Sequence, residues 1–471
     1  MLSLTNRTDT HGNPITGPQD AVDRYDDAVG HLLAYHAQLV DAVTSLATDV
    51  PDFPMGQILG AYLALTSSDQ WDVPGATEVA THLDTLTLND REGAHRAAIR
   101  TWLAGDWHGA ARRLDELLIR WPTDLLGLVV GHLLDFYLGD SANLRDRIGR
   151  SLPAFDPAHP NHGYVRGMYA FGLEESGNYQ LAEQHGLFAV DANPDDVWAT
   201  HAVTHVYEMQ GRIDEGIRFL RSGEANWGSG NLFTVHNWWH LALYLLEAER
   251  SDEALAIYDR HIHNDQSAGV PLEMVDASAL LWRLQLDGIA TSDRFGRLAD
   301  AWTTRTSHEP WYVFNDLHAV MALAGAGRLA DARAVIDRLD AYVVASAPSS
   351  NVRMTTEVGL PACRSVVAYI EDRHADVVAE LLPIRTILAR FGGSHAQRDA
   401  LQRTLVASAL RAGQLDLARA LLNERIGVRE TSIWSWRRRA ELSRAAGDRP
   451  DADRADRRAS SYASSFVAAE A

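Results

Sequence analysis

One short pattern recurs six times along this chain and restricts what it can fold into. It runs glycine, polar residue, bulky residue, two variable residues and a small residue, as in SGNYQLAE (176–183) and QGRIDEGI (210–217). The remaining copies are AGDWHGAA (104–111), AGRLADAR (326–333), AGQLDLAR (412–419) and AGDRPDAD (446–453). Apolar residues at helical spacing flank the copies, whereas alternating, strand-like stretches are nearly absent. The pattern therefore predicts short helices joined by glycine turns.

The spacing of two neighbouring copies identifies the kind of repeat. Gly177 and Gly211 lie 34 residues apart, which is the length of a tetratricopeptide repeat, a helix–turn–helix unit. Such units stack side by side, and each buries its apolar face on its neighbours. We therefore predict an all-α solenoid, a superhelix with a concave groove. We expect a poorly ordered segment over 1–20, a single solenoid over 21–450 and a C-terminal helix or tail over 451–471.

Two pairs of histidines, each spaced four residues apart, lie within this repeat pattern. They are His201 with His205 and His236 with His240, and a four-residue step on a helix places two side chains on one face. If the small residue after each turn marks position 20 of its repeat, the first pair falls at positions 5 and 9 and the second at positions 2 and 6. Glu208 falls at position 12. These positions of the first helices face the concave surface, so we expect all four imidazoles in the groove.

The same register extends the predicted site to a later repeat. With Ala332 at position 20, Phe314 and His318 fall at positions 2 and 6. Five histidines are therefore expected in one concavity, with Trp239 between the members of the second pair. Separately, Ser394 after Gly392 and Gly393 has two interpretations: an N-cap that closes a capping box with Gln397, or a helix N-terminus that binds an anion.

Three functions fit such a site. In the first, two to four imidazoles, the candidates being His201, His205, His236 and His240, bind a divalent metal such as zinc, iron or manganese. In the second, the histidines perform metal-free acid–base catalysis, namely hydrolysis, lysis or isomerisation. The side chains expected to assist are Glu208, Asp276, Asp316, Arg283 and Arg398. In the third, the groove binds a peptide or acidic ligand, and Trp239 is an aromatic platform.

Composition excludes several other classes of protein. The net charge of −20 disfavours nucleic acid and anionic membranes as partners. All 43 basic residues are arginine, so the chain has no Walker A lysine for ATP and no lysine for a Schiff base. No apolar run reaches the ~18 residues of a membrane span, no signal peptide is evident, and a single cysteine fits a reducing compartment. We expect a cytoplasmic protein with no nicotinamide dependence.

Several blocks of this sequence resemble the tetratricopeptide repeat protein 38 family, which has members in bacteria and animals. The similarity runs from about residue 20 to residue 425. The blocks are HAVTHVYEMQGR (201–212), HNWWHLALYLLE (236–247), VDASALLWRLQLDG (275–288), FNDLHAVMAL (314–323), EVGLPAC (357–363) and LLPIRTILARFGGSHAQRDAL (381–401). The resemblance implies a bacterial member of the family. The family is defined by its fold and names no reaction, so the resemblance leaves enzyme and scaffold open.

Register and resemblance together define the predicted site. The predicted catalytic residues are His201, His205, Glu208, His236, His240, His318 and Asp316. The predicted ligand-binding residues are Asn237, Trp239, Asp276, Arg283, Asn315, Arg385, Gln397, Arg398 and Asp399. We expect the groove to bind a small molecule or a peptide end. The alternative is an enzyme, a hydrolase, lyase or isomerase, with His205 and His240 as the leading proton-transfer groups. Homo-oligomerisation is left open.

Overall fold

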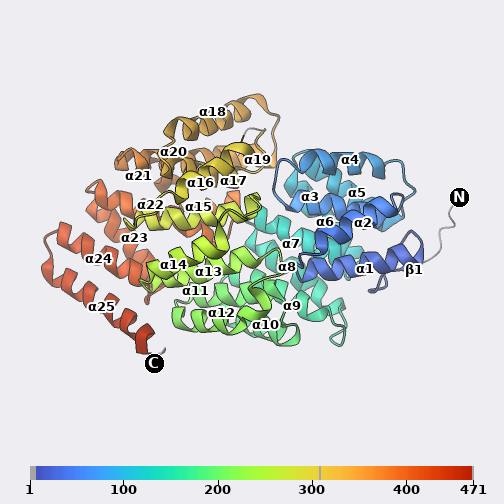
Figure 1. Ribbon diagram of the computed structural model, residues 1–471, viewed down its shortest axis with the longest axis horizontal. Coiled ribbons are helices and arrows are strands. Elements are labelled where there is room, and N and C mark those ends of the chain that lie inside the picture. Colours follow the sequence, from blue (N-terminus) through green and yellow to red (C-terminus); the bar gives the residue numbers. More distant parts are fainter. Residues whose placement is uncertain (1–6, 307–308, 469–471) are drawn as a thin grey trace.

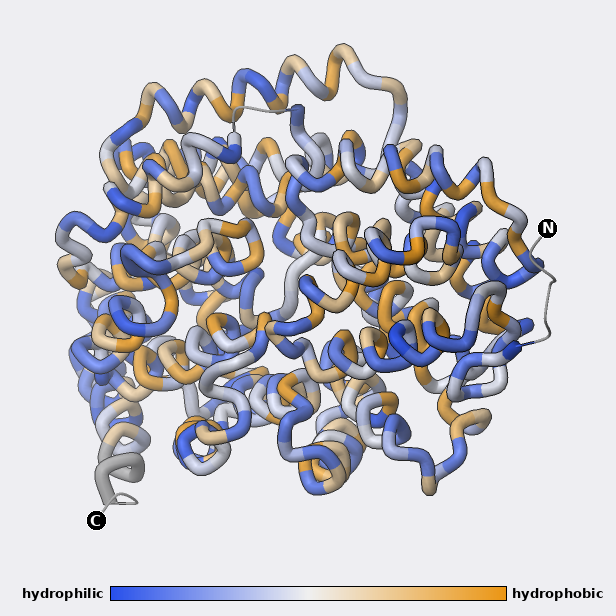
Figure 2. Tube along the Cα trace, turned by 45° about the vertical axis from the view of Figure 1, so that its right-hand side comes forward, coloured by the Kyte–Doolittle hydropathy of each residue, from blue (hydrophilic) through white to orange (hydrophobic). Residues whose placement is uncertain are grey.

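Helices in consecutive pairs make up almost all of the structure, a computed structural model that describes residues 7–306 and 309–468 (Figure 1). The fold is an all-α solenoid of the tetratricopeptide-repeat type, as the recurring pattern predicts. Figure 2 shows hydrophobic and hydrophilic residues following one another along individual helices, as expected where one face packs and the other meets water. Within the described part of the chain, no helix is long and apolar enough to cross a membrane.

The elements follow one another in three groups. The N-terminal group is β1 (Arg7–Thr8), β2 (Pro14–Ile15), α1 (Gln19–Leu33), α2 (Leu39–Asp49), α3 (Pro54–Thr66), α4 (Val73–Leu83), α5 (Asp90–Leu103), α6 (Trp107–Arg120), α7 (Leu125–Leu138), α8 (Ser141–Ser151) and η1 (Leu152–Ala154). The middle group is α9 (His162–Glu175), α10 (Tyr179–Ala192), α11 (Val197–Met209), α12 (Ile213–Trp227), α13 (Thr234–Glu247), α14 (Ser251–Ile257), η2 (Tyr258–Ile262), α15 (Pro271–Leu286) and α16 (Arg294–Arg305). The C-terminal group is α17 (Val313–Gly325), α18 (Leu329–Ala345), α19 (Ser350–Met354), η3 (Thr355–Gly359), α20 (Leu360–Ile370), α21 (His374–Ile384), η4 (Leu388–Phe391), α22 (His395–Arg411), α23 (Leu415–Val428), α24 (Ile433–Ala445) and α25 (Arg449–Ala468).

The turns inside the pairs explain why the pattern needs glycine. All six pattern glycines have φ between 68° and 85°, a left-handed conformation in which a Cβ atom is unfavourable. Glu249 and Asp372 occupy the corresponding turns after α13 and α20, with φ of 61° and 56°. The repeats that contain these two turns lack the glycine, so a search for the glycine pattern does not find them.

The small residue of the pattern is buried where its helix packs against neighbouring helices. Ala182 and Ala332 are completely buried, and at Gly216 a Cβ atom would lie only 2.3 Å from Cζ of Tyr244. Tyr244 is itself completely buried on α13. Close packing of helices α12 and α13 therefore depends on the missing side chain at Gly216.

Gly216→Ala is expected to lower the free energy of unfolding by about 1–3 kcal/mol, because the tyrosine ring has to shift within a packed core. The matched control is Gly223→Ala on the same helix, where the nearest heavy atom to a new Cβ lies at 3.4 Å, an ordinary contact. This control should raise the free energy of unfolding by ~0.5–1 kcal/mol, since alanine is the better helix former. Chemical denaturation of both variants measures the difference, and equal effects would contradict the packing argument.

The N-terminal segment differs from the expectation of poor order over 1–20. Strands β1 and β2 form an antiparallel hairpin in which Ile15 is buried. Asp9 accepts hydrogen bonds from the backbone N–H groups of His11 and Asn13, and its carboxylate lies 3.0 Å from the buried Arg91 guanidinium. A short polar segment of this kind is ordered by partners about 80 residues away, which local sequence does not reveal. Residues 1–6 lie outside the described residues.

The C-terminal segment forms helix α25, where a helix or tail over 451–471 was expected. The helix packs on α24 and extends to Ala468, and residues 469–471 lie outside the described residues.

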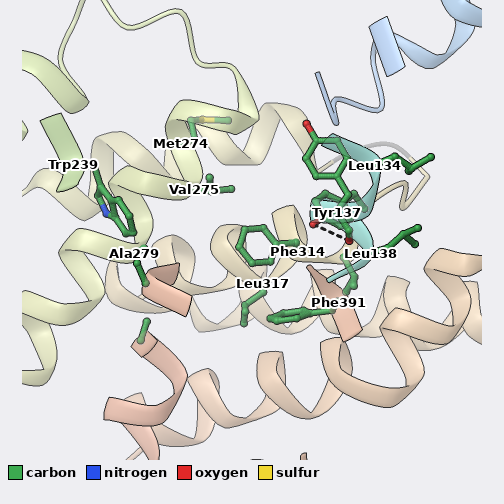
Figure 3. Packing of buried hydrophobic residues seen from close by; sticks show 14 of the residues in the cluster. Leu134, Tyr137, Leu138, Trp239, Met274, Val275, Ala279, Phe314, Leu317 and Phe391 are labelled. Carbon is green, nitrogen blue, oxygen red and sulfur yellow. Dashed lines mark hydrogen bonds between the residues drawn. The ribbon is translucent and has the colours of Figure 1, made fainter. Parts of the chain in front are cut away.

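The inner side of the superhelix is filled with side chains from helices far apart in sequence. Helix α22 packs against α11, α15 and α20, and it lies beside the middle repeats in Figure 1. On the opposite side, Asn315 of α17 donates a hydrogen bond to the Ser68 carbonyl after α3. Figure 3 shows how Phe314 of α17 and Phe391 of η4 converge with Tyr137 of α7. Side chains that face inward are therefore covered by protein.

Candidate metal centre

Two neighbouring first helices, α11 and α13, bring four imidazoles together. The Nε2 atom of His236 lies 3.1 Å from Nε2 of His201 and 3.2 Å from Nε2 of His240. The His205 ring centroid lies 4.4 Å from that of His201 and 4.5 Å from that of His240. One ring nitrogen from each of the four lies within 4.8 Å of those of the other three. The cluster thus joins two repeats, one pair of rings from each.

We expected these histidines to line a concave groove, and in the structure they are covered by protein. His201, His205 and His240 are buried, and 14% of the His236 side chain is exposed. Burial, followed by the neighbouring imidazoles, holds the pKa of His201 well below its usual range, and the pKa values of His205 and His240 are lowered in the same way. These three rings are therefore neutral near pH 7, the state in which imidazole binds a metal.

Carboxylates stand behind two of the rings at hydrogen-bonding distance. Asp276 Oδ2 on α15 lies 2.7 Å from Nδ1 of His236, and Glu208 Oε2 on α11 lies 3.2 Å from Nδ1 of His240. A carboxylate accepts hydrogen bonds, so each ring carries its proton on Nδ1 and presents an Nε2 lone pair to the centre. Carboxylate–histidine pairs of this kind orient imidazole ligands in metal sites.

This tautomer assignment leaves two lone pairs facing each other. When both rings are neutral, Nε2 of His236 and Nε2 of His240 are both acceptors, yet they lie 3.2 Å apart. A cation between them, either a metal ion or a proton on one ring, removes the conflict. Four nitrogens at ~2.0–2.1 Å around a tetrahedral ion are about 3.3 Å from one another, close to the two observed Nε2 separations of 3.1 and 3.2 Å. The chemistry of the four side chains and the spacing of His201, His236 and His240 therefore fit a metal ion, with a nitrogen of His205 within 4.8 Å of the others.

Other predicted residues surround this cluster. Trp239 is completely buried and stacks on the His236 ring with centroids 5.2 Å apart. Arg283 is buried with its guanidinium 5.6 Å from the Trp239 ring. Burial lowers the pKa of Arg283 to about 10. Asn237 donates an amide hydrogen bond to the Val197 carbonyl, so it ties α13 to α11. These three residues support the cluster from behind.

Five histidines were expected in one concavity, but the fifth, His318, is not among the imidazoles whose ring nitrogens converge. His318 donates from Nδ1 to the Phe314 carbonyl of its own helix, and it packs on the Phe314 ring. Its neighbours Asn315 and Asp316 line a small cavity together with Ser68. Each repeat is rotated relative to the preceding one along the superhelix. Two residues at the same repeat position therefore need not lie close together when their repeats are not neighbours.

The predicted residues of the C-terminal block have structural partners. Ser394 and Gln397 form a capping box at the start of α22, which favours the cap interpretation. Arg398 pairs with Glu175 at 3.2 Å, and Arg385 pairs with Glu424 on the surface. The set does not join the four histidines.

Asp399 is held by three arginines. Burial alone would raise its pKa, but the guanidinium groups of Arg425, Arg403 and Arg429 hold the pKa well below its usual range. The carboxylate is therefore ionised and links α22 to α23. It has no direct contact with the four histidines among the described interactions.

Two site residues were missed at the sequence level, Glu174 and Glu175 at the end of α9. Glu174 Oε2 lies 3.6 Å from Nδ1 of His205, and both residues are buried. The register that placed Glu208 at position 12 places Glu174 at position 12 of the preceding repeat, with Ala182 at position 20. The signal was therefore present in the repeat.

No family model matches the chain. Solved structures with a similar course include human IFIT1, crystallised as a dimer with PPP-AAAA, with 13% sequence identity over 97% of this chain and 98% of that chain and a TM-score of 0.41. Another is the APC/C hetero-tetramer Cut9–Hcn1, with 11% identity over 95% of this chain and 89% of that chain and a TM-score of 0.30. These similarities concern only the arrangement of helices along the backbone.

Proposed function

We propose that this chain binds a transition-metal ion through Nε2 atoms of His201, His205, His236 and His240 and acts on a small molecule at that ion. The observation that carries the proposal is the convergence of imidazole nitrogens, with two Nε2 lone pairs 3.2 Å apart. Among the ions expected from the sequence, zinc, iron and manganese, four nitrogen ligands suit zinc and iron best. When bound, the ion would supply Lewis-acid polarisation of a ligand.

The residues of the chain determine what can reach the ion. His236 is the partly exposed member of the cluster, so a ligand would approach along its ring. Phe233 and Trp239 lie against that ring, with centroids 4.8 Å and 5.2 Å away. Because α22 packs against α11 and α15 on the inner side, a peptide has no open channel there. A small molecule with an apolar part is the ligand favoured by these contacts.

Three finer assignments belong to the same proposal. We propose a bacterial member of the tetratricopeptide repeat protein 38 family, because the resembling blocks contain all four histidines and Asp276. We propose a cytoplasmic protein on the evidence of its single cysteine. We propose a ligand other than nucleic acid, because the net charge is −20.

Metal analysis of the purified full-length chain tests the proposal. The protein is expected to retain zinc, iron or manganese in at least one equivalent per chain, or to rebind it after a chelator has been removed. Calorimetric titration with Zn²⁺, Fe²⁺ and Mn²⁺ separately identifies the preferred ion. A chain that neither retains nor rebinds a stoichiometric amount of any of these ions contradicts the proposal.

A further inference from the structure

Glu174 is an unusual buried carboxylate. The residue is completely buried, and neither of its carboxylate oxygens has a hydrogen-bond partner within the described structure. Nδ1 of the neutral His205 ring lies 3.6 Å from Oε2, beyond hydrogen-bonding distance. Buried polar groups are ordinarily paired, and a buried charge requires an opposite charge or a metal. Glu174 therefore lacks the partner that would account for its position.

A second carboxylate lies beside it. Oxygens of Glu174 and Glu175 and a nitrogen of His205 all lie within 4.8 Å of one another. Glu175 accepts hydrogen bonds from the His395 backbone N–H at 2.8 Å and from the Arg398 guanidinium at 3.2 Å. One arginine thus faces two adjacent carboxyl groups in an enclosed part of the protein.

His205 differs from the other three histidines in a way that fits this position. Both of its ring nitrogens lack a hydrogen-bond partner within the described structure. His236 and His240, in contrast, each have a carboxylate behind Nδ1 at 2.7 Å and 3.2 Å. His205 lies between the histidine cluster and the two glutamates, because it belongs to both groups of converging ligand atoms.

We propose that Glu174, Glu175 and His205 hold a second divalent cation next to the ion of the four-histidine centre. This inference rests on the proposed function, since His205 would then bind one ion through each ring nitrogen as an imidazolate, with its remaining ring proton released to solvent. One imidazole nitrogen and two carboxylates suit Mn²⁺, Fe²⁺ or Zn²⁺. Metal–nitrogen bonds of ~2.0–2.1 Å on both sides of one ring would place the two ions about 6 Å apart.

The competing explanation is a single-metal site in which Glu174 is a protonated carboxylic acid. Burial, followed by the charges of Glu175 and Glu208, raises the pKa of Glu174 well above its ordinary value in the metal-free chain. The two explanations differ in the number of ions bound, because a neutral Glu174 offers no charge to a second cation.

Titration of the metal-free full-length chain with Zn²⁺ alone, which suits both sites, followed by metal analysis, separates the explanations. The wild type is expected to bind two equivalents and Glu174→Gln one. Glutamine keeps the size of the side chain and removes its charge, so folding of the variant is expected and is verified by circular dichroism. If Glu174→Gln fails to fold, Glu175→Gln takes its place with the same expected loss. Glu116→Gln, at an exposed position of α6, is the matched control and should keep two equivalents.

Each result of the titration either supports or overturns the second cation site. Two equivalents in the wild type and one in Glu174→Gln support the second cation. One equivalent in both proteins, or two in both, overturns the second site at Glu174 and leaves the four-histidine proposal standing. No binding of Zn²⁺ in the wild type, with Fe²⁺ and Mn²⁺ failing as well, overturns the proposed function itself.

Discussion

The double substitution His201→Gln/His240→Gln should remove the ion at the four-histidine centre and lower the metal-to-chain ratio by one. Four-ligand zinc sites bind with about 10–16 kcal/mol in total, so losing two of four ligands removes roughly half of this, a ~10⁴-fold loss of affinity. Glutamine fills a similar volume and has no imidazole nitrogen. Metal analysis and calorimetric titration against wild type measure the loss.

The carboxylates behind the rings should show a smaller effect of the same origin. Asp276→Asn replaces the acceptor of the His236 Nδ1 proton, and removing such an orienting partner lowers metal affinity by ~10–100-fold. His318→Gln is the matched control, since its own contacts are with Phe314. Full metal binding by the double variant, or an equal loss in the His318 control, would show that the ion is bound elsewhere.

The local part of the fold could be predicted because it depends on residues close together in sequence. A left-handed turn needs a residue such as Gly177 or Gly211, and the small residue after it must fit against the next helix. The spacing between the turn glycine and the small residue sets the repeat register. By that register, His201 and His205 face the same side as His236 and His240 of the next repeat, and ring nitrogens of these four residues converge in the structure.

The distant part of the site could not be predicted from register. Packing of α22 against α11 and α15 depends on how far each repeat rotates relative to the last, a small angle that accumulates over many repeats. The same accumulated rotation carries His318 away from the other histidines. Glu174, in contrast, lay within reach of the register and was overlooked because its repeat contains no histidine pair.

Helix α22 is held on the inner side of the superhelix by a buried ion network, and the largest effect on stability is expected there. Arg403 of α22 donates to Asp399 at 2.7 Å and to Glu247, the last residue of α13, at 2.9 Å. Glu247 also accepts hydrogen bonds from the Ser432 hydroxyl and the Trp434 backbone N–H at the start of α24. The guanidinium thus links α22 to α13, and Glu247 links α13 to the start of α24.

Arg403→Met is expected to lower the free energy of unfolding by about 3–5 kcal/mol, because it leaves two buried carboxylates with fewer opposite charges. The matched control is Arg385→Met, since the ion pair between Arg385 and Glu424 is substantially exposed and should contribute less than ~1 kcal/mol. Chemical denaturation of the metal-free variants measures both. If the two losses were equal, apolar packing such as that of Trp282 would be what holds α22 in place, and the network would add only orientation. A larger loss for Arg403 means that the cover over the histidines depends on charge, and metal exchange should then be faster in Arg403→Met than in wild type.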